Sequence, residues 1–318
     1  MWEATNVANA DILHGPPDEK GFSFDETVTC DYSPKTKYNG LSPKFPCAIN
    51  GDDVVKVKYG RDNGEVFAEV AATRLLWALG FGADHMYPVR VICHGCSKDP
   101  LTDRGWHEGT VAFDPASIER RFPGKELESH GITGWKWPEL DLVSAEAGGA
   151  PIEQRDALKL IAVMLQHTDS KAEQQRLLCL DDHAKREPAA ECEHPFMMLN
   201  DVGITFGRAN LQNDKDPGSV NLDAWSHTHV FTTDKGPCTG NIAKSFSGTL
   251  EYPHISEEGR KFLSGLLAQL SDGQLRDLFT VARFPARMSP EKLSSGTVDQ
   301  WVDAFKAKRA EIASRTCS

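Results

Sequence analysis

Two short stretches decide the fold: His167-Thr168-Asp169-Ser170-Lys171-Ala172-Glu173-Gln174 and Phe196-Met197-Met198-Leu199-Asn200-Asp201-Val202-Gly203. The first stretch follows residues 152–167, whose apolar residues recur at helical spacing, and it precedes an apolar run at 177–180. The second stretch is a short apolar strand that ends in Asp-x-Gly. The sequence therefore predicts a helix, a polar loop and two strands, with acidic, basic and amide side chains at their ends.

These side chains match the requirements of phosphoryl transfer from ATP. The reaction needs a carboxylate near the acceptor hydroxyl, a cation beside the transferred phosphoryl group, and oxygen ligands for Mg²⁺ or Mn²⁺. Asp169, Lys171, Gln174 and Asp201 supply that set. A catalytic loop followed by a hairpin that delivers Asp-x-Gly is also the order found in kinases.

The first stretch resembles the kinase catalytic loop H-R-D-L-K-P-E-N, and residues 200–207 resemble the metal-binding D-x-G region of atypical kinases. These are the secretory-pathway casein and xylose kinases, the HipA-type kinases and the phosphatidylinositol kinases. Residues 68–72 resemble the helix that pairs with the nucleotide-binding lysine in those proteins. The loop matches at His167, Asp169, Lys171 and Glu173, and the whole resemblance spans residues 56–207.

The resemblance implies a role for each matched residue. Asp169 would orient or deprotonate the acceptor, and Lys171 would neutralise charge on the phosphoryl group. Asp201 and Gln174 would hold the metal, while His167 would be structural. The chain departs from the family twice: Gln174 replaces the usual Asn, and no G-x-G-x-x-G precedes the lysine strand, where only Asn39-Gly40 is near.

Glu69 is expected to be buried and paired with a lysine. It lies within the apolar stripe of a helix predicted over 65–79, and a buried carboxylate is costly without a partner. Lys56 and Lys58 share one face of the preceding strand, so either lysine can pair with Glu69 and bind the α- and β-phosphates. We slightly favour Lys56, because Val54 then shares its face and can pack on adenine.

The predicted fold class is α+β, a bilobal protein-kinase-like fold with a small α/β lobe and a mostly helical lobe. Residues 1–96 form an N-terminal arm and the nucleotide-binding lobe, with a hairpin over 44–59 around Asn50-Gly51 and a strand at 87–93. Residues 97–318 form the catalytic lobe, with a proline-rich insert at 97–150. In that insert, Trp135-Lys136-Trp137 is either a glycan-stacking platform or insert packing.

The composition argues against some classes of binding partner. The 35 basic and 46 acidic residues give a net charge of −11, which argues against nucleic acid and anionic membranes. No apolar run approaches the roughly 18 residues that a membrane-spanning helix needs, and the first residues lack the basic and apolar regions of a signal peptide.

The eight cysteines allow either disulfides in an oxidising compartment or buried thiols in the cytoplasm. We expect some to be bridged, with Cys93 or Cys96 among them, and Cys93-His94-Gly95-Cys96 with Cys192-Glu193-His194 is a weaker zinc alternative. The disulfide interpretation favours an extracytoplasmic protein, periplasmic or secreted. The cysteines are Cys30, Cys47, Cys93, Cys96, Cys179, Cys192, Cys238 and Cys317.

The functional expectation is an ATP- and metal-dependent kinase that acts on a hydroxyl of a protein or glycan, with a lipid headgroup also open. The alternative is a pseudokinase, a nucleotide-binding scaffold without turnover, which Gln174 and the absent glycine-rich loop favour. AMP transfer on an inverted nucleotide is a third possibility.

Overall fold

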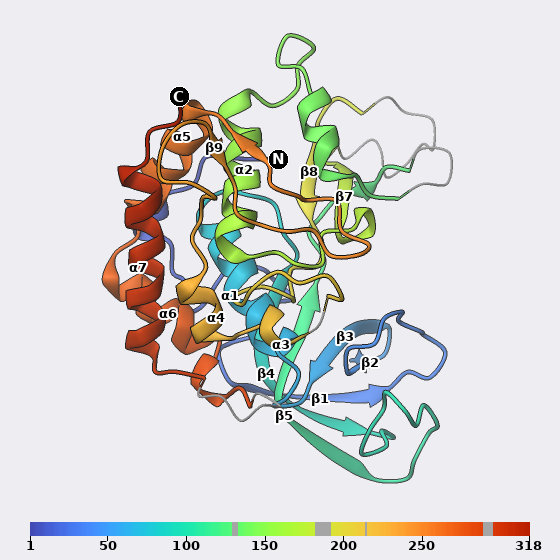
Figure 1. The fold of residues 1–318 in the computed structure, drawn as a ribbon. Helices are drawn as coiled ribbons and strands as arrows, with labels where there is room; N and C mark the ends of the chain where they lie inside the picture. The colour runs from blue at the N-terminus through green and yellow to red at the C-terminus, as the bar shows by residue number, and fades with distance from the viewer. Residues whose placement is uncertain (129–132, 182–191, 214, 289–294) are drawn as a thin grey trace.

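The computed structural model describes residues 1–128, 133–181, 192–213, 215–288 and 295–318, and it has an α+β fold (Figure 1). The strands are β1 (Glu26–Tyr32), β2 (Lys44–Ile49), β3 (Asp53–Tyr59), β4 (His85–His94), β5 (Thr110–Arg120), β6 (Lys125–Glu126), β7 (Gln175–Cys179), β8 (Pro195–Leu199), β9 (Cys238–Thr239) and β10 (His254–Ile255). The α-helices are α1 (Glu65–Ala78), α2 (Ile152–Leu165), α3 (Lys215–Gly218), α4 (Leu222–His227), α5 (Glu257–Leu267), α6 (Asp272–Val281) and α7 (Val298–Ser314).

Five strands close into a barrel in the order β1-β2-β3-β5-β4, with β1 and β4 pairing in parallel. Alternation along β3 explains its orientation: Val55, Val57 and Tyr59 are buried in the barrel core, and the two lysines between them point to the other face. The predicted hairpin of β2 and β3 is present, with Lys44 directly opposite Lys58.

The barrel extends beyond the segments in which we expected strands. The N-terminal arm supplies β1, and residues 97–150 supply β5, which pairs with both β3 and β4. Because β5 ends at Arg120, the sheet of the small lobe continues past the boundary expected at residue 96. The division of the chain into two lobes stays a prediction.

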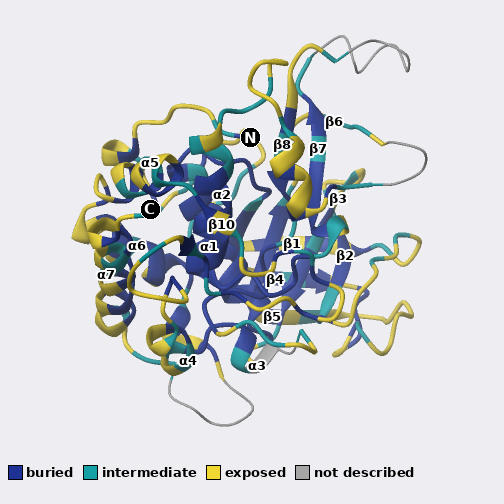
Figure 2. Cartoon of the chain, turned by 45° about the horizontal axis from the view of Figure 1, so that its top comes forward, coloured by how far each residue is buried: buried dark blue, intermediate teal, exposed yellow. Residues whose placement is uncertain are grey.

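α1 lies between the barrel and the helices. It packs against β4 and β5 and also against α6, and every residue of the helix except Trp77 is buried (Figure 2). The N-terminal arm joins the same core, because Val7 and Ile12 are buried there and Gln274 of α6 donates a hydrogen bond to the Val7 carbonyl at 2.8 Å.

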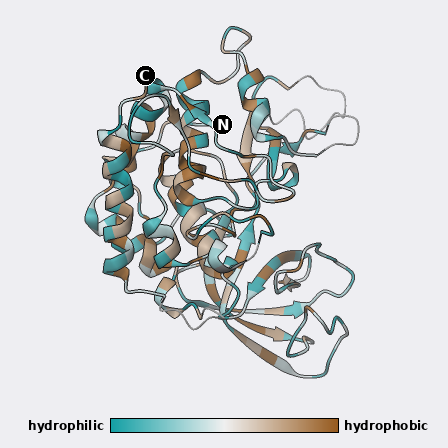
Figure 3. Ribbon diagram, viewed as in Figure 1, coloured by the Kyte–Doolittle hydropathy of each residue, from teal (hydrophilic) through white to brown (hydrophobic). Residues whose placement is uncertain are grey.

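The remaining helices form a second packed region around α2, which contacts α5, while α7 lies against α4, α5 and α6. Hydrophilic residues are frequent along α7, which is an outer helix (Figure 3). Trp135 and Trp137 are both buried with ring centroids 5.3 Å apart, so they are packing residues rather than an exposed platform.

The prediction of disulfides is confirmed, because all eight cysteines are bridged. The Cys93–Cys96 bond excludes the zinc alternative, as does the bond that joins Cys192 to Cys179. The other two bonds are Cys30–Cys47 in the barrel and Cys238–Cys317 near the C-terminus. Within the described ranges, none of the helices combines the length and apolar composition needed to cross a bilayer.

Candidate active site

Lys58 is the centre of a buried charge cluster. Its side chain is fully enclosed, and its Nζ lies 2.6 Å from Glu69 Oε2, 3.1 Å from Glu65 Oε2 and 3.7 Å from Asp201 Oδ1. β3 supplies the lysine, α1 supplies both glutamates, and the segment after β8 supplies the aspartate. Three separate parts of the chain therefore bring their charged groups to one point.

The preference for Lys56 as the partner of Glu69 was wrong. Lys56 Nζ instead lies 2.5 Å from Oε2 of Glu119, on β5. The period of two along a strand places both lysines on one face, so it cannot choose between them. Lys58 is the lysine nearer the start of α1, whereas Lys56 faces the neighbouring strand.

Sequence reasoning missed Glu65 as part of this cluster. Glu65 lies four residues before Glu69, so the two side chains share one helix face. That spacing was an available signal. Ser42 donates a hydrogen bond to Oε1 of Glu65, which connects the loop before β2 to the cluster.

The charged groups of the cluster shift one another's pKa values. Burial opposes ionisation of Lys58, but Asp201, Glu69 and Glu65 raise its pKa well above the usual range. Burial also opposes ionisation of Asp201, yet Lys58, Lys56 and Lys44 hold its pKa well below the usual range. Burial raises the pKa of Glu69. Lys58 and Asp201 are therefore a charged pair at neutral pH.

The predicted catalytic loop is joined to Asp201 by the backbone. The Gln174 carbonyl accepts hydrogen bonds from the amides of Asn200 at 2.8 Å and Asp201 at 3.2 Å, and the Thr168 amide donates to the Ile204 carbonyl at 3.1 Å. The loop and the Asp-x-Gly segment, predicted separately from sequence, are thus held side by side.

One carboxylate oxygen of Asp169 accepts a hydrogen bond, and the other has no hydrogen-bond partner among the described residues. Its Oδ2 accepts a hydrogen bond from Nε2 of Gln174 at 2.6 Å and lies 3.4 Å from Nζ of Lys171. Its Oδ1 is buried and has no hydrogen-bond partner among the residues described. Since buried polar atoms are normally paired, this oxygen is suited to accept a proton or hydrogen bond from a bound group.

His167 is buried beside the same loop, and its ring centroid lies 6.1 Å from that of Trp137. Burial lowers the pKa of His167 to about 4, although Asp169 and Asp201 act in the opposite direction. The imidazole is therefore neutral at pH 7, which agrees with a packing role.

The oxygen donors near Asp201 suit a hard cation. The Asp201 side chain is 24% exposed, and its Oδ1 accepts a hydrogen bond from the Gly203 amide. Gln174 is next to Asp201 through its backbone carbonyl, and its side-chain amide donates to Asp169. Carboxylate and amide oxygens of this kind fit Mg²⁺ or Mn²⁺. Within the described residues, two other groups could offer metal ligands, Cys30 with Cys47 and Cys93, and Cys179 with Asp181 and Cys192, but every cysteine in them is in a disulfide bond.

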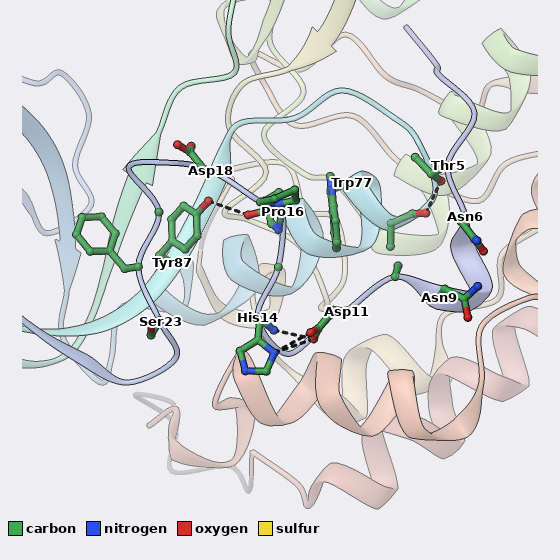
Figure 4. A pocket seen from close by; sticks show the side chains of 16 residues that line it. Thr5, Asn6, Asn9, Asp11, His14, Pro16, Asp18, Ser23, Trp77 and Tyr87 are labelled. Atoms are coloured by element: carbon green, nitrogen blue, oxygen red, sulfur yellow. Dashed lines mark hydrogen bonds and ion pairs between the residues drawn. The ribbon is translucent and has the colours of Figure 1, made fainter.

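A cavity of about 670 Å³ lies elsewhere, between the N-terminal arm and α1 (Figure 4). Trp77 and Tyr87 line it together with Asp11 and His14, whose side chains form an ion pair at 2.8 Å. None of the predicted site residues is among those that line it.

No protein-family model matches the chain, and no curated protein sequence matches it. Among solved structures it is similar to a proinflammatory kinase of Helicobacter pylori, CtkA, with a TM-score of 0.45 and 11% identity over 91% of this chain and 95% of that chain. It is also similar to the Golgi casein kinase with Mn and ADP bound, with a TM-score of 0.37 and 10% identity over 91% of this chain and 73% of that chain.

Both TM-scores are below 0.5, so the function is inferred from the site itself. The resemblance to HipA-type and phosphatidylinositol kinases stays a prediction.

Proposed function

We propose that the protein is a kinase-like phosphotransferase that uses ATP and a divalent cation. The observation that carries the proposal is the contact of Lys58 with Glu69 at 2.6 Å and with Asp201 at 3.7 Å. A buried strand lysine, a helix glutamate and an Asp-x-Gly carboxylate form the arrangement that kinases use to hold ATP and its metal. Burial of so many charges is costly, which favours a functional reason for keeping them.

Each residue has a proposed role. Lys58, fixed by Glu69, binds the α- and β-phosphates. Asp201 and the amide oxygen of Gln174 hold Mg²⁺ or Mn²⁺, which when bound neutralises negative charge on the phosphates. Asp169 accepts the proton of the acceptor hydroxyl, and Lys171 stabilises charge on the transferred group.

The proposed acceptor is a hydroxyl of a protein or glycan outside the cytoplasm. Four disulfides support this location, because disulfides persist in oxidising compartments and are rare in the cytosol. The net charge of −11 disfavours nucleic acid as a partner.

A nucleotide-binding scaffold without turnover is the second candidate. Two observations favour it: Gln174 stands where Asn is usual, and Lys58 has no exposed surface in this conformation. The scaffold makes a different prediction, namely ATP binding by the wild type without phosphoryl transfer.

Transfer of the γ-phosphoryl group from radiolabelled ATP tests the proposal, with Mg²⁺ and with Mn²⁺, to the protein itself and to protein and glycan acceptors. Asp169→Asn is expected to lower the rate by about 10²–10⁴-fold, the usual loss on removing a general base, and to keep ATP affinity. Asp52→Asn, an exposed turn carboxylate, is the matched control. ATP binding by the wild type without transfer to any acceptor would select the scaffold.

A further inference from the structure

Lys44 is a second lysine beside the charge cluster. β2 pairs with β3 so that Lys44 lies directly opposite Lys58, and directly opposed residues in a sheet share one face. Unlike Lys58, Lys44 is half-buried and forms no ion pair with any residue that the structure describes. Burial and the neighbouring charge of Lys58 lower the pKa of Lys44.

The loop between β1 and β2, residues 33–43, folds over this face of the sheet. Tyr38 lies with its ring centroid 5.6 Å from Nζ of Lys56, and Ser42 bonds to Glu65. Gly40 lies close to Lys44, because a Cβ on Gly40 would be 2.8 Å from Lys44 Nζ. Gly40 also has a φ of +95°, which favours glycine. The loop therefore occupies the place at which a glycine-rich loop covers the phosphates in protein kinases.

The space under this loop is positively charged. A cavity of about 250 Å³ is lined by Lys37, Lys44 and Arg104, and its lining includes Thr36 and Tyr38 but no acidic residue. This differs from the whole chain, in which acidic residues outnumber basic ones. A cavity with three cations and no carboxylate favours an anion.

Lys58 alone offers little positive charge to a nucleotide. The single ammonium group of Lys58 already faces three carboxylates, so little of its positive charge remains for a polyphosphate. Lys44 lies on the same face and forms no ion pair with a described residue, although the charges of Glu65 and Asp201 act on it, so its ammonium group adds attraction for phosphate groups.

We propose that Lys44, under the 33–43 loop, contacts the terminal phosphates of the nucleotide and replaces the backbone amides of the absent glycine-rich loop. This inference rests on the proposed function, because it assigns a further residue to the same nucleotide site. It extends that function by predicting that the site recognises the length of the phosphate chain through a side chain.

Calorimetric titration of wild type, Lys44→Met and Lys35→Met with ATP and with AMP, each with Mn²⁺, tests the inference. Lys35 is an exposed residue of the same loop that does not line the cavity, so it is the matched control. We expect Lys44→Met to weaken ATP binding about tenfold to a hundredfold, the range for losing a charge-assisted hydrogen bond. AMP binding should change less than about threefold, and Lys44→Arg should restore part of the ATP affinity.

The outcomes separate the two proposals. If the wild type binds ATP and Lys44→Met keeps the same ratio of ATP to AMP affinity, the role of Lys44 is overturned while the proposed function stands. An equal loss for both nucleotides also overturns it, because that result indicates a general disturbance of the site. If the wild type binds neither nucleotide, the proposed function itself fails, and this inference fails with it.

Discussion

Replacing Lys58 by methionine tests whether the buried charge cluster exists. The methionine keeps most of the side-chain length and removes the ammonium group, which lies within 4 Å of three carboxylates. Removing one partner of a buried ion pair leaves uncompensated charge and costs about 3–5 kcal/mol. A folded domain typically has about 5–15 kcal/mol of stability, so the variant should fold but unfold at lower denaturant concentration.

The loss of stability should depend on pH. Burial raises the pKa of Glu69 above its value in the unfolded chain. A carboxyl group with a raised folded-state pKa contributes stability that is present below its unfolded pKa and is lost as the pH rises through its folded pKa. Without Lys58 that pKa rises further, so the difference between wild type and variant should be larger at about pH 8 than at about pH 5.

Urea unfolding followed by tryptophan fluorescence, under non-reducing conditions, measures these differences. Lys56→Met is the matched control, because Lys56 has one close carboxylate and its side chain is 17% exposed. We expect its loss to be smaller, on the order of 1 kcal/mol. Equal losses for the two variants, with no dependence on pH, would refute the cluster.

Three further results are expected. Asp201→Ala should abolish Mn²⁺-dependent ATP binding, since its charged, partly exposed carboxylate is the proposed metal ligand; wild-type affinity by calorimetry would remove it from the proposed metal site. Gly203→Ala should lose about 1–3 kcal/mol in urea unfolding, because its Cβ would meet Glu65 Cγ at 2.7 Å. The control Gly265→Ala has open space on α5 and should not be destabilised; equal effects would contradict the crowding. Alkylation without reductant should label no cysteine by intact mass, and eight labelled thiols would overturn the disulfides and the proposed location.

The elements with strong local patterns were predictable from sequence. β3 has alternating apolar residues, and the turn before it contains Asn50 and Gly51, which both adopt positive φ. α1 and α2 begin and end close to the expected residues: Gly80 and Gly82 follow α1, and apolar residues recur at helical spacing along α2.

The partners of the two lysines could not be predicted, because they depend on the position of β5. Pro115 lies within this strand, and proline normally argues against a strand assignment. Without β5 there was no reason to expect Glu119 beside Lys56, so the partners of the two lysines stayed open. Long-range pairing between strands decides such contacts, and a single sequence does not reveal it.

α1 is buried along its length except at Trp77, so it has little free surface along which to move. A helix with an exposed side can roll or slide by exchanging surface contacts, and kinases are commonly regulated by movement of the helix that carries the lysine-binding glutamate. Here a shift of α1 would disturb the barrel, α6 and the N-terminal arm at once, because close-packed interiors resist displacement. The Lys58–Glu69 pair is therefore a fixed part of the framework, and the 33–43 loop, which contacts α1 through the Ser42–Glu65 hydrogen bond, lies at its edge.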